Sequence, residues 1–270
     1  MNNNNYSNNK NHIKNTFKES VINEWTLSNW EARVEQLPEV NAAGLVGITE
    51  LTGGTINKTF KAITKKGTWV VRFNNDELPG IHRPTEAKVL EAIQPLTIAP
   101  KLIANNLKKG YLITEYFEGE LWTQDDLNNP EKLMQLAMHL KPLHAIPFES
   151  KRTELVFRLV EYIHYFSKMD ASLKSAINAT VSELNKLGFW KKQSQLLHFD
   201  LNPLNIISEG EHIRIIDWEY AGAGHPVIEW CVIQSYAQND LSKILSQFAA
   251  IDYHSKVQEL IDLMMEMWDQ

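Results

Sequence analysis

Short runs of alternating apolar and polar residues indicate that the first part of the chain is rich in β-strands. Between residues 46 and 73, β-branched and aromatic residues are interrupted by two turn-forming sequences, at 52–55 and at 65–67. Glycine and polar residues in such positions are typical of turns between strands, and we therefore expect three short antiparallel strands. In the third strand, alternation places the aromatic residues and Val71 on one face and Arg72 on the other.

Helical spacing appears on both sides of this strand-rich region. Ser28 and Glu31 form a capping-box pattern, which predicts a short helix beginning next to them. A second helix is expected from about Arg83, and Glu86 lies on its apolar stripe. Two further strands are expected after this helix, the second over residues 111–116.

Beyond Gly119 the apolar residues are spaced mainly as in helices. Helices are expected from Asn129-Pro130 onward, over 152–168 and 171–188, and again from about residue 226. Residues 196–216 break this pattern and indicate short strands around an irregular loop. A β-rich part joined to a helical part near residue 117 predicts an α+β chain of two lobes, and ligands commonly bind in a cleft between lobes.

The composition is that of an ordinary globular protein with an acidic balance. The chain has 270 residues, of which 43% are hydrophobic and 22% are charged, and its formal net charge is −6. It contains no run of basic residues of the kind that binds the phosphate backbone, so no nucleic-acid partner is expected. Residues 1–15 are rich in asparagine, and we expect them to be disordered.

One stretch of the chain carries acids but no bases. Residues 215–242 contain no Lys or Arg but include Asp217, Glu219, Glu229 and Asp240, and these charges exclude a membrane-spanning helix there. The N-terminus lacks the apolar segment of a secretory signal, and the single cysteine, Cys231, cannot form an intramolecular disulfide. A soluble protein in a reducing cytoplasmic compartment, without a membrane partner, is therefore expected.

The most informative polar residues lie between apolar strands in the second half of the chain. His198, Asp200 and Asn205 have the spacing His-x-Asp-x-x-x-x-Asn, and Asp217 follows Asp200 by 17 residues. This set offers one base and two oxygen ligands. Phosphoryl transfer requires such groups, because a carboxylate orients the attacking hydroxyl while amide and carboxylate oxygens hold Mg²⁺ on the nucleotide phosphates.

Together with the sequence Ile-Asp-Trp-Glu-Tyr-Ala-Gly at 216–222, these motifs resemble a known family. The family is the aminoglycoside phosphotransferase and choline kinase group, and the likeness is strongest to bacterial thiamine kinases. It covers roughly residues 45–235. It implies a two-lobed protein-kinase-like fold, with a nucleotide-binding lobe at 16–117 and a catalytic and acceptor-binding lobe at 118–270. It also implies ATP and Mg²⁺ as cofactors and a small-molecule hydroxyl as the phosphate acceptor.

The resemblance also implies roles for residues of the second lobe. Asp200 matches the catalytic base and His198 the residue that supports its loop, while Asn205 and Asp217 match the metal ligands. Glu219 matches an acid beside the metal and the acceptor. The remaining candidates for acceptor contact, for which core packing or loop support is the alternative, are Trp218, Tyr220 and Glu229. For Glu229, a hydrogen bond to the catalytic-loop backbone is favoured over substrate contact, and His144 is interpreted only as a helix-end residue.

In the first lobe, the resemblance points to residues that bind the nucleotide. The sequence at 51–57 resembles a phosphate-covering hairpin, with Gly53, Gly54, Thr55 and Asn57 as its candidate residues. Arg72 takes the place of the phosphate-binding lysine. A pair between Arg72 and Glu86 is expected, because Glu86 would otherwise be an unpaired buried carboxylate. Glu115 and Phe117 belong to the segment that resembles the adenine-binding hinge.

Several acceptors are compatible with these motifs. A cationic metabolite is favoured, with thiamine first and choline or ethanolamine second, because aromatic residues beside the motifs can bind a cation. The 53 residues after Asp217 weigh against a large choline kinase, and the Trp-Glu-Tyr sequence weighs against an aminoglycoside phosphotransferase. A non-catalytic pseudokinase would lack a base or a metal ligand, and neither is missing. The motifs leave the oligomeric state open.

Overall fold

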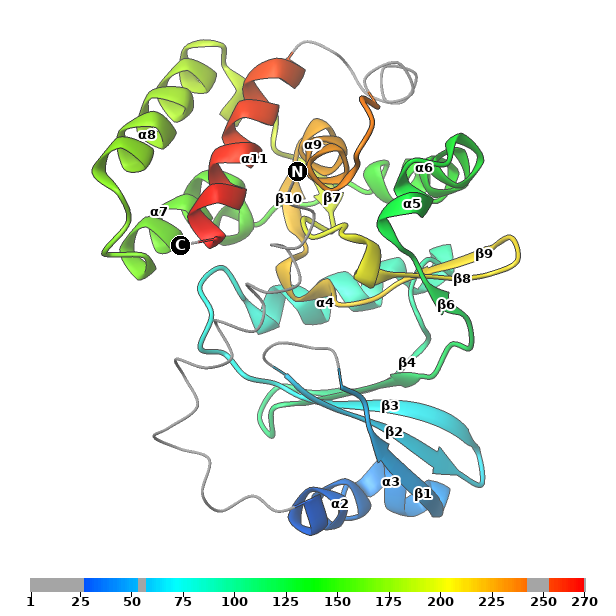
Figure 1. Cartoon of the computed structure of the whole chain (residues 1–270). Coiled ribbons are helices and arrows are strands. Elements are labelled where there is room, and N and C mark those ends of the chain that lie inside the picture. Colours follow the sequence, from blue (N-terminus) through cyan, green and yellow to red (C-terminus); the bar gives the residue numbers. More distant parts are fainter. Residues whose placement is uncertain (1–26, 53–56, 242–252, 270) are drawn as a thin grey trace. The chain divides into compact units, whose positions relative to one another are not determined.

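The chain forms two compact units, shown in the computed structural model of Figure 1. The model describes residues 27–52, 57–241 and 253–269, so the predicted disorder of residues 1–15 lies outside the described residues. Among the described residues, the first unit includes 27–52, 57–75 and 102–116, and the second includes 76–101, 117–241 and 253–269. The predicted lobes divide after residue 117 and stay a prediction, whereas residues 76–101, expected in the first lobe, belong to the second unit.

A five-stranded antiparallel sheet forms the centre of the first unit, with the order β1-β2-β3-β5-β4. The three strands predicted from alternation are present, and so are the two predicted further along. Their bounds are β1 Leu45–Glu50, β2 Lys58–Thr64, β3 Gly67–Phe73, β4 Leu102–Asn106 and β5 Tyr111–Glu115. Among the residues described from 27 onward, two helices precede the sheet, α2 at Leu27–Glu35 and α3 at Pro38–Ala43.

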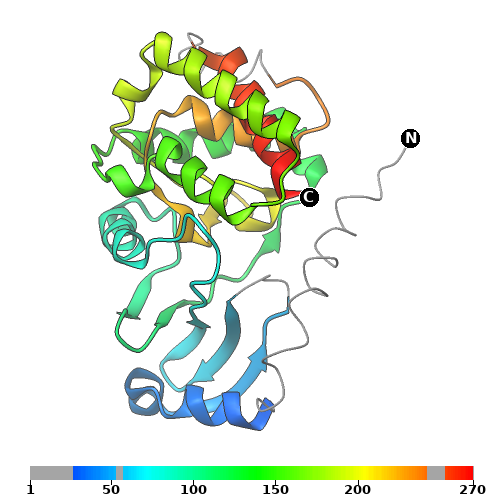
Figure 2. The ribbon, with the colours of Figure 1, turned by 90° about the vertical axis from the view of Figure 1, so that its left-hand side faces the viewer.

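One face of this sheet is buried under α2 and α3 (Figure 2). Val34 and Val40 of these helices are fully buried and belong to the same apolar cluster as Val71 and Phe73 of β3. The alternation predicted for this strand is therefore confirmed. Arg72 is on the other face, yet it is only 8% exposed.

The second unit is mainly helical and carries two small antiparallel sheets, β6-β8-β9 and β10-β7. Its α-helices are α4 Arg83–Ile93, α5 Gln124–Leu127, α6 Pro130–His144, α7 Leu155–Tyr165, α8 Ala171–Lys186, α9 Val227–Tyr236 and α11 His254–Trp268. Its strands are β6 Glu120–Leu121, β7 Gln195–Leu197, β8 Ile206–Glu209, β9 His212–Ile215 and β10 Gly222–Gly224. Its short 3₁₀ turns are η1 Gln94–Leu96, η2 Lys151–Thr153, η3 Phe189–Lys192, η4 Pro203–Asn205 and η5 Trp218–Tyr220.

One apolar cluster of the second unit is built mainly by α7, α8, α9 and α11. α11 packs against both α8 and α9 (Figure 1). Cys231 of α9 is fully buried in this cluster, and burial raises the pKa of its thiol. Cys231 is therefore a core residue. None of the described helices has both the length and the apolar character needed to cross a bilayer.

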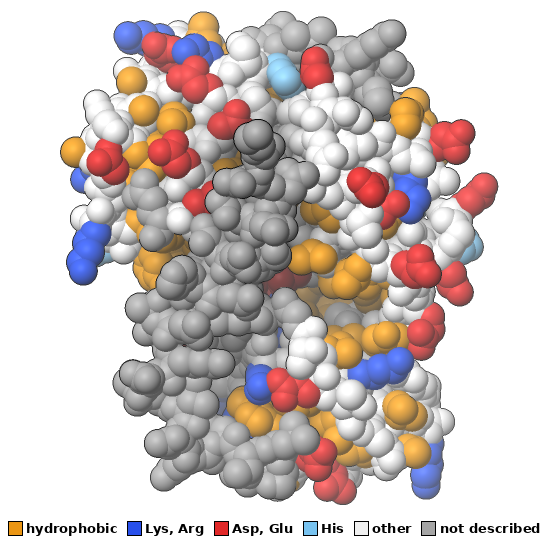
Figure 3. Space-filling view, in the orientation of Figure 1, with side chains coloured by type: hydrophobic (Ala, Val, Ile, Leu, Met, Phe, Trp, Pro, Cys, Tyr) orange, Lys and Arg blue, Asp and Glu red, His pale blue; other side chains and the backbone are white. Residues whose placement is uncertain are grey.

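Charged side chains of both signs are scattered over the surface of the described residues. On the face drawn in Figure 3, Lys and Arg side chains lie among Asp and Glu side chains rather than in one patch. Three acids of the second unit, in contrast, are buried: Glu86, Glu219 and Glu229 are at most 4% exposed. Their partners define the candidate site.

Two leucines near the end of α8 should differ sharply in their contribution to stability. Leu184 is fully buried, whereas Leu187, which caps the same helix, is 54% exposed. We expect Leu184→Ala to lower the free energy of unfolding by about 2–5 kcal/mol, because it leaves a cavity. The matched change Leu187→Ala should cost less than about 0.5 kcal/mol. Urea denaturation measures both, and equal losses would contradict the packing described for α8.

Candidate active site

The predicted catalytic loop runs from β7 to the turn η4 in the second unit. Phe199 adopts a left-handed conformation, with φ of 70°, just before Asp200. The side chain of Asn202 accepts a hydrogen bond from the Leu204 backbone N–H at 3.0 Å and thereby caps η4. The loop is thus shaped by its own short polar side chains. It leaves Asp200 half-buried at the end of a buried strand.

The structure brings the predicted base and the predicted metal ligands together. The Asn205 amide nitrogen donates to the Asp200 backbone oxygen at 2.8 Å and to Asp200 Oδ2 at 2.9 Å. The Ile216 backbone N–H donates to the Asn205 backbone oxygen at 2.9 Å. This bond places the residue before Asp217 beside Asn205, although the two segments are separated by the β8-β9 hairpin.

The side chains of Asn205 and Asp217 fit a magnesium ion in their donor chemistry. Because the Asn205 amide nitrogen faces Asp200, its carbonyl oxygen lies on the other side of the amide group. Asp217 supplies a carboxylate from a left-handed residue with φ of 63° at the start of η5. Amide and carboxylate oxygens are hard ligands that suit Mg²⁺, which commonly keeps several waters and substrate phosphates as its other ligands.

His198 supports the loop through hydrogen bonds that its neutral ring makes with the backbone. It is fully buried, its Nε2 donates to the Ile216 carbonyl at 2.9 Å, and its Nδ1 accepts from the Asp200 backbone N–H at 3.2 Å. Burial lowers the pKa of His198. Both ring nitrogens are used by backbone groups, so the geometry supports a structural role rather than proton transfer by His198.

Glu229, in the first turn of α9, holds the backbone of the same loop. Its fully buried carboxylate accepts hydrogen bonds from the backbone N–H groups of His198, at 2.5 Å, and Phe199, at 2.9 Å. Its second oxygen lies 2.6 Å from Nε2 of His144 at the end of α6. His144 is therefore more than the helix-end residue that its sequence context indicates, because it is a partner of a buried carboxylate.

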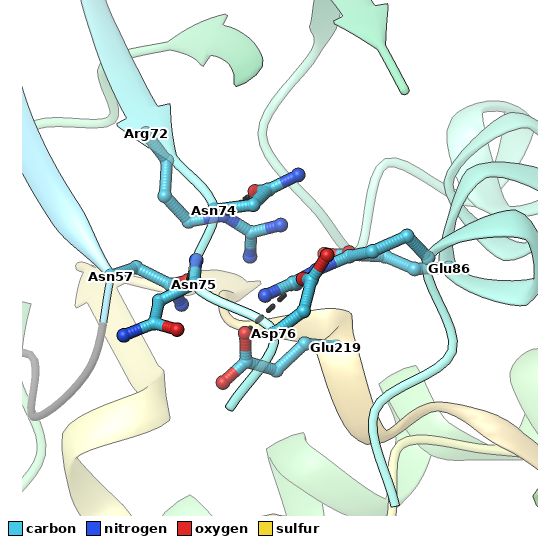
Figure 4. Close-up of polar contacts among 8 residues, drawn as sticks. Asn57, Arg72, Asn74, Asn75, Asp76, Glu86 and Glu219 are labelled. Atoms are coloured by element: carbon cyan, nitrogen blue, oxygen red, sulfur yellow. Dashed lines mark hydrogen bonds and ion pairs between the residues drawn. The ribbon is translucent and has the colours of Figure 1, made fainter. Parts of the chain in front are cut away.

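Glu219 is also buried, and its partner is a residue that the motifs do not single out. Arg83 Nη1 lies 2.9 Å from Glu219 Oε2 and 2.8 Å from Glu86 Oε2. Figure 4 shows Glu86 and Glu219 on either side of this cluster, with Asp76 beside them. A sequence signal for Arg83 exists, because it precedes Glu86 by three residues at the start of a predicted helix, a spacing that favours ion pairs.

The explanation for Glu86 thus changes from the one predicted. Glu86 has a buried counter-ion, Arg83, within its own unit, so its burial does not require Arg72. Arg72 belongs to the first unit, where its Nε donates to Asn74 Oδ1 at 3.1 Å (Figure 4). A pair between Arg72 and Glu86 would join the two units and stays a prediction.

Other predicted nucleotide-binding residues lie near the end of β3 or at the break between the units. Asn57 Oδ1 accepts from the Asn75 backbone N–H at 3.0 Å (Figure 4). Gly53, Gly54 and Thr55 lie outside the described residues. Glu115 ends β5, while Phe117 begins the next part of the second unit and has the Arg214 guanidinium 4.9 Å from its ring centroid.

The aromatic candidates for acceptor contact differ in their surroundings. Trp218 is 3% exposed, its indole N–H donates to the Ile215 carbonyl at 2.8 Å, and its ring packs edge-on to His198. Tyr220 is only partly buried. Burial raises the pKa of its phenol, and Tyr162, Glu219, Asp200 and Asp217 raise it further. Packing therefore accounts for Trp218, whereas Tyr220 lies within the field of the three acids.

A buried arginine behind the catalytic loop also escapes the sequence motifs. Arg158 of α7 is 1% exposed, and its guanidinium lies 4.4 Å from the centroid of the Phe199 ring. Burial lowers the pKa of Arg158 and raises that of the neighbouring Tyr162 to about 12. In the sequence, Arg158 lies among apolar residues of a predicted helix, and this unusual position is the signal by which the sequence alone could single it out.

Comparison with known sequences identifies relatives of this chain. A model of a phosphotransferase enzyme family matches residues 47–254, which include every predicted site residue. Protein LicA of Haemophilus influenzae is 30% identical over 156 residues, in a match that covers 54% of this chain and 56% of that protein. The chain thus spans about half the length of the curated Haemophilus relatives it matches.

Solved structures show the same fold. The choline kinase LicA from Streptococcus pneumoniae has a TM-score of 0.70 at 20% identity, over 89% of this chain and 88% of that chain. A thermostable mutant of an aminoglycoside phosphotransferase, in a ternary complex with ADP and hygromycin B, has a TM-score of 0.60 at 16% identity. That match covers 83% of this chain and 86% of the mutant. These likenesses confirm the predicted protein-kinase-like fold.

His198 should make the stability of the protein depend on pH. The pKa of His198 is lowered in the folded state, so the unfolded chain binds more protons near its ordinary value of about 6.5. The part of the free energy of unfolding that depends on His198 is fully present above about pH 6.5, and it is lost as the pH falls toward the pKa of His198 in the folded state. We expect His198→Gln to lose less free energy of unfolding between pH 7 and pH 5 than the wild type does. Urea denaturation measures this, the exposed His212→Gln is the control, and equal losses in all three proteins would refute the expectation.

Proposed function

Because this chain belongs to the phosphotransferase enzyme family, we propose that it transfers the γ-phosphate of ATP to the hydroxyl group of a small cationic metabolite. One observation carries the proposal. The amide of Asn205 is bonded to Asp200, and the backbone of Asn205 is bonded to the residue before Asp217. The residues proposed as base and as metal ligands therefore lie close together in one unit, and a base with two oxygen ligands is the set that phosphoryl transfer requires.

Asp200 is the proposed catalytic base. It is half-buried, whereas the side chains that hold its loop, His198 and Glu229, are fully buried. An acceptor hydroxyl can therefore approach the carboxylate while the loop behind it stays fixed. Asp200 orients this hydroxyl and accepts its proton as the oxygen bonds to the γ-phosphorus and ADP leaves.

Asn205 and Asp217 are the proposed magnesium ligands. The ion, when bound, neutralises charge on the phosphate oxygens. The residues of this chain supply the Asn205 carbonyl oxygen and the Asp217 carboxylate, and the bond from Ile216 N–H to Asn205 fixes the two segments beside each other. Catalysis then consists of positioning and charge neutralisation, without a covalent intermediate on the protein.

The first unit supplies most of the proposed nucleotide contacts, and Phe117 adds one from the second unit. Arg72 offers a guanidinium fork that can bind two phosphate oxygens at once, and its stem is anchored in the sheet by β3. Gly53, Gly54, Thr55 and Asn57 are proposed to cover the phosphates, and the backbone near Glu115 and Phe117 is proposed to bind adenine. The ADP-bound phosphotransferase of the same fold supports an adenine nucleotide as the donor.

Choline is the acceptor that we favour. The motifs alone put thiamine before choline, but the relatives reported above reverse this order, because they include LicA proteins and a choline kinase named LicA. The charge of the site agrees with a cation. Asp200 and Asp217 both act on the phenol of Tyr220, and an aromatic ring near carboxylates suits a quaternary ammonium group. Aminoglycosides, which are also cationic alcohols, are the second candidate because of the hygromycin-bound neighbour.

Turnover with a panel of acceptors tests the function. We expect ATP-dependent phosphorylation to be fastest with choline among choline, ethanolamine, thiamine and hygromycin B, with the product identified by ³¹P NMR. Asp200→Asn should lower turnover by about 10²–10⁴-fold, the usual contribution of a general base, and leave ATP binding intact. Glu211→Gln, a matched loss of one charge on the exposed β8-β9 turn, should leave turnover unchanged. ATP binding without turnover on any acceptor would refute the kinase and favour a nucleotide-binding scaffold.

Asp217→Asn should act mainly on the metal. Replacing a carboxylate ligand by a neutral amide weakens a hard-cation site, so the Mg²⁺ concentration for half-maximal activity should rise by about 10-fold or more. Initial rates measured against free Mg²⁺ at saturating ATP give this value, and chelation by EDTA should abolish activity in the wild type. An unchanged Mg²⁺ requirement would exclude Asp217 as a ligand.

A further inference from the structure

The first residue of α4 joins two buried carboxylates that are far apart in the sequence. Arg83 is 7% exposed, and its Nη1 lies 2.8 Å from Glu86 Oε2 and 2.9 Å from Glu219 Oε2. The side chains of both glutamates are no more than 3% exposed. Arg83 Nε reaches a third acid, Asp76, at 2.7 Å, whose side chain is 68% exposed. The guanidinium therefore binds carboxylates from three segments of the chain: the segment before α4, α4 itself and η5.

The charge of Arg83 is what makes this arrangement stable. Two buried carboxylates that share one donor nitrogen repel each other, and removing a buried counter-charge commonly costs about 3–5 kcal/mol. Burial alone would lower the pKa of Arg83, but Glu86 and Glu219 raise it above its ordinary value. Arg83 is thus a permanent cation, and its planar fork fixes the direction of each bond.

Glu219 connects this cluster to the predicted metal site. It lies in the short turn η5, which begins directly after Asp217. The backbone on the other side of Asp217 is held by the bond from Ile216 N–H to Asn205. Asp217 itself is left-handed, a conformation that costs about 1–3 kcal/mol for a residue other than glycine and persists only when its neighbours enforce it. The bond to Arg83 is one of the contacts that hold the following turn.

We propose that Arg83 is a positioning residue for the magnesium site, because it anchors Glu219 to α4 and thereby fixes the turn that carries Asp217. The inference rests on the proposed function, since it concerns the metal of the same reaction. It assigns Glu219 a bridging role between α4 and η5. It also explains why a stretch without any Lys or Arg can bury this acid, since α4 supplies the cation.

A positioning role can be distinguished by experiment from a role in fold stability alone and from a role in charge balance alone. A residue that only stabilises the fold changes the melting temperature, but not the metal affinity of the protein that remains folded. A residue that only balances charge is replaced by lysine without loss. A positioning arginine requires the fork, so Arg83→Lys should weaken metal binding even though the charge is kept.

The test compares Arg83→Lys and Arg83→Gln with the wild type in two assays. Mn²⁺ binding to the full chain with ADP, followed by electron paramagnetic resonance, reports the metal directly. Initial rates of choline phosphorylation against free Mg²⁺ report its use. We expect both variants to raise the Mn²⁺ dissociation constant and the half-saturating Mg²⁺ by about 10- to 100-fold, the usual effect of a residue that orients a ligand. The control is Arg152→Lys, because Arg152 is exposed and its guanidinium lies 3.9 Å from the carboxylate of Glu161. This change should alter neither value.

A double-mutant cycle shows whether Arg83 acts through Glu219. In the Glu219→Gln background, Arg83→Lys should cause less than about a twofold further change, because the contact it breaks is already lost. Glu219→Asp keeps the charge but shortens the reach to Arg83, and it should mimic Arg83→Lys if an Arg83 variant fails to fold. Additive effects in the cycle, or wild-type metal binding in folded Arg83→Lys, would overturn the inference.

The outcomes also separate this inference from the proposed function. If the wild type binds Mn²⁺ with ADP but phosphorylates no acceptor, the function fails, and a weakened Mn²⁺ signal in Arg83→Lys still supports the positioning role. If the wild type phosphorylates choline and Arg83→Lys does so with an unchanged Mg²⁺ requirement, the function stands and the positioning role fails.

Discussion

Burial of the carboxylates of Glu219 and Glu229 is the constraint on which the candidate site depends. Both lie in a stretch of 28 residues that has no Lys or Arg, so their partners must come from other elements. Helix α4 supplies Arg83 to Glu219, and helix α6 supplies His144 to Glu229. An uncompensated buried charge would cost several kcal/mol, so these contacts tie the two helices to the loops that carry Asp200 and Asp217.

The two buried acids act on different parts of the site. Glu229 bonds two successive backbone N–H groups, and it therefore fixes the path of the chain just before Asp200. Glu219 makes a side-chain contact with α4 just after Asp217. The half-buried Asp200 and the proposed metal ligands Asn205 and Asp217 thus stand between two anchored segments. Such anchoring gives the reacting groups defined positions before any ligand binds, which is the main source of rate in phosphoryl transfer.

Arg83 changes the explanation of Glu86 that the family resemblance suggests. In that explanation, a buried glutamate on the first long helix needs an arginine from the sheet. Here Glu86 already pairs with Arg83, and the same guanidinium continues to Glu219. Arg83 therefore connects Glu86, which is predicted to help bind the nucleotide, with Glu219, which follows the predicted metal ligand by two positions. In this chain, α4 is joined to η5 within the second unit, whatever contacts Arg72 makes.

The sequence by itself determined those features that depend on neighbouring residues. Alternation in residues 46–73 gave the strands of the first unit, and the spacing of His198, Asp200 and Asn205 gave the loop, because eight successive residues in a tight turn must lie close together. Only the tertiary structure decided the partners of the buried acids. Arg83 and Glu219 are 136 positions apart, and His144 and Glu229 are 85 apart. Local patterns carry no information about such pairs, since helix packing alone selects which side chain reaches which carboxylate.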